Sequence, residues 1–560
     1  MIRTATSLDP PPTQRCRCPM PDKPTTPGPE HFDLRTEEWV PVSGDGSRTV
    51  GLRELFLDAH HIGGLAIALP PAASGLLRVL YAITARITGL WEVEGREWYN
   101  RRYGLLARSG DGFEPAAVEA YFTRYATRFR LHDPDRPWLQ DPRLRAECPG
   151  GSGVNKLVMA RPAGNNQIWF GHFTDDEQIP LASGDAALHL LAQLYYGPSG
   201  QCTPRTVAGQ RFGNAYAGPL RKVLSYHPVG RSLYETLLLG LPGPGTFEDG
   251  RAERGRAADQ CPWERDELPN PLAPPPAPAG PLSALTEQYR HAVLLTPGAD
   301  GRTVVDATIT WAIRANRPPY EDPYVLWDEG KDGTRRPREA DANRALWRDL
   351  DALVNENRGG EGGHRPRILT DLNSQLPRPV ADSLRVHALG FDQDGQTRDR
   401  TYFTAATPPL FNLLNPAYAA DNELRLDIRE GRESAEKAAY RLESALQNAW
   451  RAYTTPFEGE KPGGTAKDRR KRGGPWPALA LGGYWPKAEQ LFWSALEARD
   501  FTDSLRSFGR LALVEYDAVT AQVAATPRGA KACEGARGLV RSLLRTDRAA
   551  TSGLKSEVGR

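Results

Sequence analysis

Residues 186 to 234 combine cationic side chains in a way that suits contact with a polyanion. The stretch contains no aspartate or glutamate, although the chain has 69 acidic residues among its 560. Its cations are Arg205, Arg211, Arg221, Lys222 and Arg231. Arginine supplies a fixed positive charge and a planar fork of donors, and the missing carboxylates remove local repulsion of phosphate. We therefore treat Arg205, Arg211, Arg221 and Lys222 as candidate DNA contacts.

The middle of the same stretch is rich in glycine. It runs through Tyr196, Gly197, Pro198, Ser199, Gly200 and Gln201, followed by Gly209, Gly213 and Gly218. Glycine has no Cβ, so its backbone can approach another molecule closely. The pattern favours a loop pressed against a nucleic-acid backbone or groove. An irregular surface loop in an arginine-rich chain is the alternative.

Two further segments have compositions that nucleic-acid contacts need. Residues 165–175 mix aromatic and amide side chains, which suits base stacking and base-edge contacts but also a half-buried strand. Residues 461–474 place a group of cations among glycines, namely Lys467, Arg469, Arg470, Lys471 and Arg472. This basic loop either contacts phosphates or is simply solvated.

Patterns typical of catalysis and metal binding are missing. The sequence has no P-loop, no H-E-x-x-H and no G-x-S-x-G, and only Cys16 and Cys18 lie close together among its six cysteines. We therefore expect no enzyme activity, no cofactor and no structural metal. Sparse cysteines suit a reducing cytosol, and no apolar run is long enough to cross a bilayer. These features predict a cytoplasmic protein without a membrane partner.

The elements that position these residues predict an α+β fold. We expect a disordered leader over 1–30, a globular body over 31–405, an antiparallel, four-helix-type bundle over 406–550, and a tail over 551–560. A Pro-rich excursion at 243–280 has the composition of a linker. Apolar periodicity predicts body helices at 72–90, 115–129 and 185–195, and bundle helices at 434–453, 487–499 and 511–544. Alternation around a turn at 297–301 predicts a hairpin within 293–313.

Two short patterns carry a resemblance to a known family. Phe32-Asp33-Leu34 followed by Trp39-Val40-Pro41-Val42 resembles the F-N-L-x-x-x-x-W-I-P-V opening of CasA, the large subunit of the type I-E CRISPR complex Cascade. The G-F-D-Q-D-G-Q turn at 390–396 is similarly placed. The helix and glycine loop at 188–218 and the helical C-terminal part follow the family's order, so the resemblance covers essentially 31–550.

This resemblance implies a non-catalytic subunit of a CRISPR RNA-guided surveillance complex. It would recognise the protospacer-adjacent motif of double-stranded DNA, help open the duplex and recruit a helicase-nuclease. Tyr196 to Gln201, called the motif loop below, would read that motif. A wedge would consist of Gly395, Gln396 and Thr397, and a loop docking near the guide RNA and the other Cascade subunits would contain Phe170, Gly171 and His172.

One part of the resemblance leaves a choice open. The family's basic finger is a lysine on a hairpin, whereas the matching segment here, 303–310, contains no lysine. Arg302 and Arg314 are the alternatives. Two other classes of function also stay open: a nucleotide- or nucleic-acid-processing enzyme with its pocket at the glycine loop, and a purely scaffolding subunit.

Overall fold

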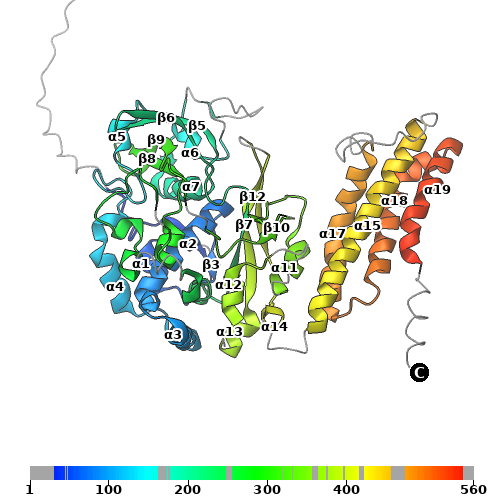
Figure 1. Ribbon diagram of the computed structural model, residues 1–560, viewed down its shortest axis with the longest axis horizontal. Coiled ribbons are helices and arrows are strands. Elements are labelled where there is room, and N and C mark those ends of the chain that lie inside the picture. Colours follow the sequence, from blue (N-terminus) through cyan, green and yellow to red (C-terminus); the bar gives the residue numbers. More distant parts are fainter. Residues whose placement is uncertain are drawn as a thin grey trace, which may run out of the picture.

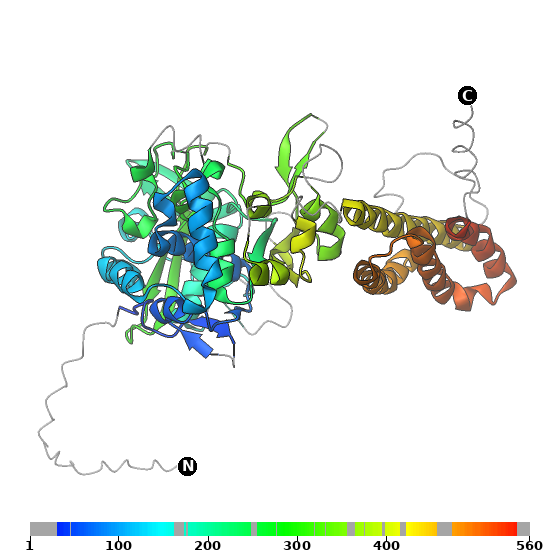
Figure 2. The ribbon, with the colours of Figure 1, turned by 90° about the horizontal axis from the view of Figure 1, so that it is seen from below.

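The structure is a computed structural model. It describes residues 31–44, 46, 48–161, 173–174, 177–247, 255–275, 277–317, 320–330, 332–355, 364–373, 376–394, 398–414, 422–455 and 473–545. Figure 1 shows a mixed body of helices and small sheets beside a bundle of long helices, and Figure 2 shows the same two parts from below. The expected α+β class is confirmed. The expected leader and tail lie outside the described residues.

A nearly fully buried helix, α2 (Pro70–Thr88), runs through the body. Pro70 starts it, where a missing N–H costs nothing, and Gly89 ends it with a left-handed φ of 64°. Helix α7 (Ser183–Tyr196) packs on α2 so closely that a Cβ at Gly75 would lie 2.8 Å from the Tyr195 ring. The apolar periodicity predicted both helices correctly.

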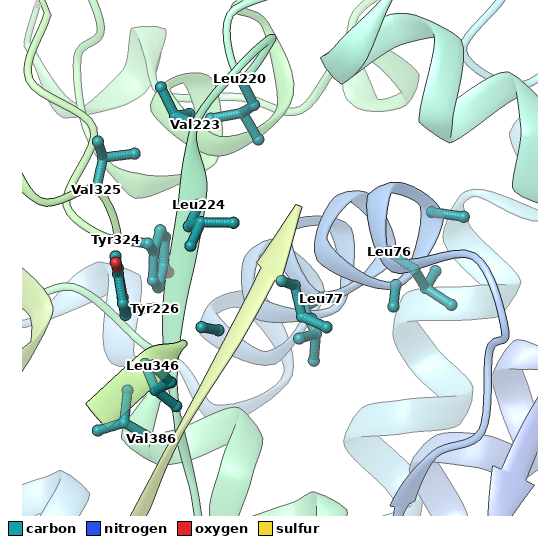
Figure 3. Packing of buried hydrophobic residues seen from close by; sticks show 14 of the residues in the cluster. Leu76, Leu77, Leu220, Val223, Leu224, Tyr226, Tyr324, Val325, Leu346 and Val386 are labelled. Carbon is teal, nitrogen blue, oxygen red and sulfur yellow. The ribbon is translucent and has the colours of Figure 1, made fainter. Parts of the chain in front are cut away.

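Two three-stranded antiparallel sheets flank these helices. One has the order β13 (Arg398–Ala406), β12 (Arg385–Asp394) and β7 (Leu224–Val229). The other has the order β4 (Leu181–Ala182), β9 (Thr303–Trp311) and β8 (His291–Pro297). Leu77 of α2, Leu224 of β7 and Val386 of β12 belong to one buried apolar cluster (Figure 3). The hairpin predicted within 293–313 is confirmed as β8–β9, with Val293 opposite Ile309.

The remaining described strands and α-helices of the body are all shorter than α2. The strands are β1 (Val40–Ser43), β2 (Arg48–Val50), β3 (Gly64–Leu65), β5 (Gly200–Val207), β6 (Gln210–Ala215), β10 (Trp327–Glu329) and β11 (Arg335–Pro337). The α-helices are α1 (Leu52–Leu57), α3 (Gly95–Ala107), α4 (Pro115–Arg124), α5 (Leu144–Glu147), α6 (Val154–Leu157), α8 (Leu233–Leu239), α10 (Pro281–Thr286), α11 (Leu350–Val354), α12 (Arg367–Thr370), α13 (Arg378–Ser383) and α14 (Phe411–Leu414).

The described part of the Pro-rich excursion is packed on the body, which differs from the expected linker. Trp263 is buried and its Nε1 donates to the Tyr121 hydroxyl at 2.9 Å. Glu264 is an ion-pair partner of Arg86, whose guanidinium lies over the Trp91 ring. Linker-like composition was misleading because a few aromatic and charged side chains anchor the segment.

The bundle consists of α15 (Asn422–Thr454), α17 (Trp476–Ala498), α18 (Ser504–Ala524) and α19 (Pro527–Arg541), which pack on one another. The predicted segment 511–544 is therefore two helices and not one. Thr526 accepts a hydrogen bond from Gly529 N and so caps α19, and Pro527 occupies its first position. Helix α17 begins at Trp476 and not at 487 as predicted, and Pro486 lies inside the helix. Within the described residues, no helix is long and apolar enough to cross a membrane.

Candidate nucleic-acid interface

The motif loop joins the end of α7 to the start of β5. Tyr196 is buried, Pro198, Ser199 and Gly200 are half-buried, and Gln201 is exposed. From Gly200 onward the expected irregular glycine loop is instead the β5–β6 hairpin, with Gly200 opposite Ala215. Its two-residue turn has positive φ at Ala208 (47°) and Gly209 (77°), as a type I′ turn requires.

The backbone of the motif loop forms hydrogen bonds with residues elsewhere in the body. Gly197 accepts a hydrogen bond from Gly218 N at 2.9 Å, and a Cβ on Gly197 would lie 2.5 Å from Gln193 O. His291 Nε2 lies 3.0 Å from Pro198 O, which can only accept, so the ring donates from Nε2. Burial lowers the pKa of His291 to about 4, so the ring is neutral at pH 7. Residues outside the loop thus hold it by hydrogen bonds to the main-chain oxygens of Gly197 and Pro198.

The loop also shares a support with strand β12. Arg221 Nη1 donates to Tyr196 O at 2.8 Å, and the guanidinium carbon lies 4.8 Å from the Phe391 ring centroid. The Tyr196 and Phe391 rings are 5.5 Å apart between centroids. Phe391 is on β12, which leads toward the predicted wedge at 395–397. Strand β12 and the base of the motif loop are therefore in direct contact through Phe391, Tyr196 and Arg221.

The side chains of two motif-loop residues face no internal partner. Within the described part of the chain, neither Ser199 nor Gln201 makes a side-chain hydrogen bond. The loop thus combines a fixed backbone with donors and acceptors that an external partner can use.

Two predicted DNA contacts are corrected by their burial. Arg205 is fully buried and forms ion pairs with Asp141 at 2.8 Å and Glu147 at 2.6 Å. Arg221 is also buried, in the support described above. A guanidinium that is enclosed and occupied in this way does not reach a phosphate. The acid-free local sequence was misleading because the carboxylates that hold Arg205 come from the segment 141–147.

The other cations of this region are accessible. Arg211 is exposed on β6, and its side chain makes no hydrogen bond or ion pair within the described residues. Lys222 Nζ lies 3.6 Å from a Glu339 carboxylate oxygen at the surface. For the finger, Arg302 pairs with Glu37 at 3.2 Å, whereas Arg314 donates to Asn214 O at 2.9 Å. Arg314 also lies over the Phe212 ring, so it is attached to the β5–β6 hairpin.

Three predicted sites fall outside the described residues. They are the docking loop Phe170, Gly171 and His172, the wedge Gly395, Gln396 and Thr397, and the basic loop residues Lys467, Arg469, Arg470, Lys471 and Arg472.

Two supporting residues were missed by the sequence analysis. His291 and Phe391 contact the motif loop from elements far along the chain. His291 gave no local signal, because its partner is a main-chain oxygen in a different segment. Phe391 did have a signal, since it lies in the G-F-D-Q-D-G-Q turn, but its packing role was not inferred.

Comparisons of the sequence with known proteins point to one family. The sequence profile of the family described as CRISPR-associated protein Cse1 matches residues 33–527. A "CRISPR-associated protein CasA/Cse1" of Thermus thermophilus is 32% identical over 224 residues, which are 39% of this chain and 41% of that protein. The matched region thus spans less than half of that relative's length.

Solved structures extend the likeness to most of the fold. A chain of a "CRISPR RNA-guided surveillance complex" is 41% identical, with a TM-score of 0.78 over 91% of this chain and 99% of that one. The Thermus thermophilus CasA (Cse1) structure is 20% identical, with a TM-score of 0.69 over 92% of this chain and 99% of that one, and shares the fold. The chain belongs to the CRISPR-associated Cse1 (CasA) family.

Proposed function

We propose that this chain is the non-catalytic large subunit of a CRISPR RNA-guided surveillance complex. In this role it recognises the protospacer-adjacent motif of double-stranded DNA, helps open the duplex and recruits a helicase-nuclease. The observation that carries the proposal is the motif loop itself. Its backbone is anchored by Arg221 and His291, while the side chains of Ser199 and Gln201 form no hydrogen bond with any residue that the structure describes.

The likeness to a solved surveillance complex supports the assembly part of the proposal. That likeness, at 41% identity, covers nearly the whole of the solved chain. The other subunits and the guide RNA are the expected partners, and Phe170, Gly171 and His172 are the proposed docking residues. Guide pairing would then carry the sequence information, as in other RNA-guided systems.

The chemistry of the loop suits the minor groove. Donor and acceptor patterns are degenerate there, so a loop that presents one hydroxyl and one amide would tolerate several motifs. Arg211 and Lys222 would contact phosphates beside it, with Arg302 or Arg314 as the finger. Arg314 is the better placed of the two because it lies against the β5–β6 hairpin.

The shared support of loop and β12 suggests how reading and opening are connected. Phe391 packs on Tyr196 and lies a few residues before the proposed wedge. A wedge must compensate for stacking lost at the first opened step, which costs a few kcal/mol. The cations Lys467, Arg469, Arg470, Lys471 and Arg472 would bind the phosphates of the displaced strand.

The proposal is tested by adding the purified chain to a guide-loaded core complex that lacks it. Two guide-matched duplexes, differing only in the bases that flank the target, are titrated at one fixed salt concentration. The proposal predicts that the chain tightens binding to one flank selectively. Equal tightening of both, or of neither, would reject motif reading and favour a scaffold; metal-dependent turnover of nucleic acid by the chain alone would favour an enzyme.

A further inference from the structure

A cavity of about 280 Å³ lies in the body beside the segment that holds the motif loop. Pro219 and Leu220 form part of its lining. They directly follow Gly218, whose N–H donates to Gly197 O of the motif loop at 2.9 Å, and Leu220 N donates to Tyr195 O at 3.0 Å. The rest of the lining includes residues of α2, α10, β10 and β11. The cavity therefore adjoins the base of the motif loop.

The lining of this cavity has more positive than negative charge. Its cations are Arg78, Arg290 and Arg317, and Asp322 is the carboxylate among the lining residues. Arg78 donates to both Asp322 oxygens, at 2.7 and 3.1 Å, so that carboxylate is already paired. Arg290 and Arg317 form no ion pair within the described part of the chain, and the Arg290 side chain forms no hydrogen bond there either. These two positive charges thus have no counter-charge among the described residues.

Arg290 and Arg317 lie close together. Arg317 Nη2 donates to Tyr289 O at 2.8 Å, and this oxygen belongs to the peptide group that joins Tyr289 to Arg290. Burial, and after it the charge of Arg290, lower the pKa of Arg317 to about 10. Glu287 acts in the opposite direction, but its carboxylate pairs with Arg265 at 2.6 Å. Because both arginines line one cavity and the charge of Arg290 reaches Arg317, a single anion can bind to both.

Two neighbouring guanidiniums without a counter-charge are unfavourable in a folded protein. Both side chains are half-buried, so less water screens the repulsion between them. Charged groups that leave water are normally paired. A bound anion would supply the missing charge to both arginines. Phosphate suits them because each planar fork can donate two parallel N–H bonds to its oxygens.

Tyr216 connects Arg290 to the motif loop in space. Tyr216 is 45% exposed and follows Ala215, which lies opposite Gly200 of the loop. Burial lowers the pKa of Arg290 and Tyr216 opposes this effect, which places the two side chains near each other. Arg314 lies over the same tyrosine, with its guanidinium carbon 5.7 Å from the ring centroid. A DNA strand bound at the motif loop is therefore within reach of Arg290.

We propose that Arg290 and Arg317 form a binding site for one phosphate group in this cavity. Two sources share that chemistry: a phosphate of the DNA backbone beside the motif, and free inorganic phosphate. The DNA source rests on the proposed function, whereas phosphate binding by the chain does not. Phosphate binding is measured on the chain alone and flank discrimination on the assembled complex, so the failure of one is distinguishable from the failure of the other.

The first experiment melts the full-length chain in potassium phosphate and in potassium chloride at the same pH and ionic strength. We expect phosphate to raise the melting temperature of the wild-type chain by about 2 °C more than chloride does. Arg290→Met should remove most of this difference. The same variant should melt higher than wild type in chloride, because the repulsion of Arg317 is gone. Arg510→Met, an exposed arginine on α18, is the matched control and should keep the wild-type difference.

Three results of the melting experiment would overturn the proposal. The first is a wild-type chain that phosphate stabilises no more than chloride. The second is an equal phosphate effect in wild type and Arg290→Met, which indicates a general salt effect. The third is an Arg290→Met chain that melts lower than wild type in chloride, which indicates that Arg290 supports the fold and not a ligand.

A second experiment identifies the source of the phosphate. Wild type and Arg290→Met are each assembled into the guide-loaded complex, and binding of a guide-matched duplex is titrated at several salt concentrations. A slope of log K against log salt that is smaller by about 0.9 in Arg290→Met assigns the site to one phosphate of the DNA. An unchanged slope assigns it to free phosphate. Each result supports the site, provided that the melting experiment has shown phosphate binding.

Discussion

The motif loop and the junction between body and bundle are both held by arginine, but in different ways. At the junction, side chains bind side chains: Arg344 and Arg348 approach Glu436 at 3.1 and 3.2 Å, and Arg432 pairs with Asp351 at 2.9 Å. At the loop, Arg221 and His291 bind main-chain oxygens. At the junction, the charged groups of the side chains are occupied by ion pairs that hold body and bundle together. The arrangement at the loop leaves Ser199 and Gln201 available to a partner.

The junction is the place where a single substitution should cost the most stability. Arg432→Leu leaves the nearly buried Asp351 without its ion-pair partner, and breaking a buried pair costs about 3 kcal/mol. Chemical unfolding of the isolated chain measures this loss. Arg429→Leu removes an exposed pair with Glu433 and should change stability by at most about 0.5 kcal/mol. An equal loss of stability in the two variants would mean that the Arg432–Asp351 ion pair does not hold the junction together.

The motif-loop backbone is tightly packed at Gly197, so a larger side chain there should lower the stability of the protein. Gly197→Ala places a Cβ 2.5 Å from Gln193 O and 2.7 Å from the His291 ring, so it should cost about 2 kcal/mol. Gly104→Ala is the control, because it lies in helix α3 with open space around it, and it should stabilise by about 0.5 kcal/mol. Thermal melting compares them. A neutral Gly197→Ala would show that the loop has room to move.

Arg221 and Arg211 should separate stability from DNA binding. Arg221→Gln loses the bond to Tyr196 O and should cost about 1.5 kcal/mol. Arg211→Gln should leave stability unchanged but lower the slope of log K against log salt by about 0.9, which is one phosphate contact. Melting and duplex titrations at several salt concentrations measure the two effects. An unchanged slope for Arg211→Gln would remove that residue from the interface.

Acidification should weaken the support of the loop. The native pKa of His291 is about 4 because of burial, whereas an unfolded histidine titrates near 6.5. As pH falls from 6.5 to 4, the unfolded chain takes up the proton first, so His291 alone lowers the native stability by up to about 1.4 kcal/mol per pH unit. Burial also lowers the pKa of other histidines, such as His132 and His189, which act in the same direction. His291→Gln should therefore reduce the slope by the contribution of one histidine, and exposed His61→Gln should leave it unchanged. A profile that is the same in wild type and His291→Gln would contradict the assignment of a neutral ring.

Elements governed by local sequence were predictable. The apolar spacing over 72–90 predicted α2, and the turn at 297–301 predicted the β8–β9 hairpin; the structure contains both elements. The break between α18 and α19 was also encoded, by Thr526 before Pro527, but it was outweighed by the continuous periodicity around it. Glycine in the β5–β6 segment indicated a loop, although Gly209 serves a tight hairpin turn.

Contacts between distant segments could not be predicted. Arg205 has no acid near it in the sequence, yet it binds Asp141 and Glu147 in the fold. His291 and Phe391 reach the motif loop from β8 and β12 for the same reason. A stretch of sequence without carboxylates therefore does not by itself predict exposed positive charge. Acidic residues from distant segments can pair with its arginines in the fold, as Asp141 and Glu147 do with Arg205.

The most direct test of motif reading compares two exposed glutamines on the same hairpin. Gln201→Ala removes an amide of the motif loop, and Gln210→Ala removes one next to the hairpin turn. Each variant is assembled into the guide-loaded complex, and the ratio of the Kd values for the two flanking sequences is measured. The account predicts that Gln201→Ala lowers this ratio by about tenfold, from a loss of about 1.4 kcal/mol, while Gln210→Ala preserves it. An unchanged ratio in Gln201→Ala would contradict it.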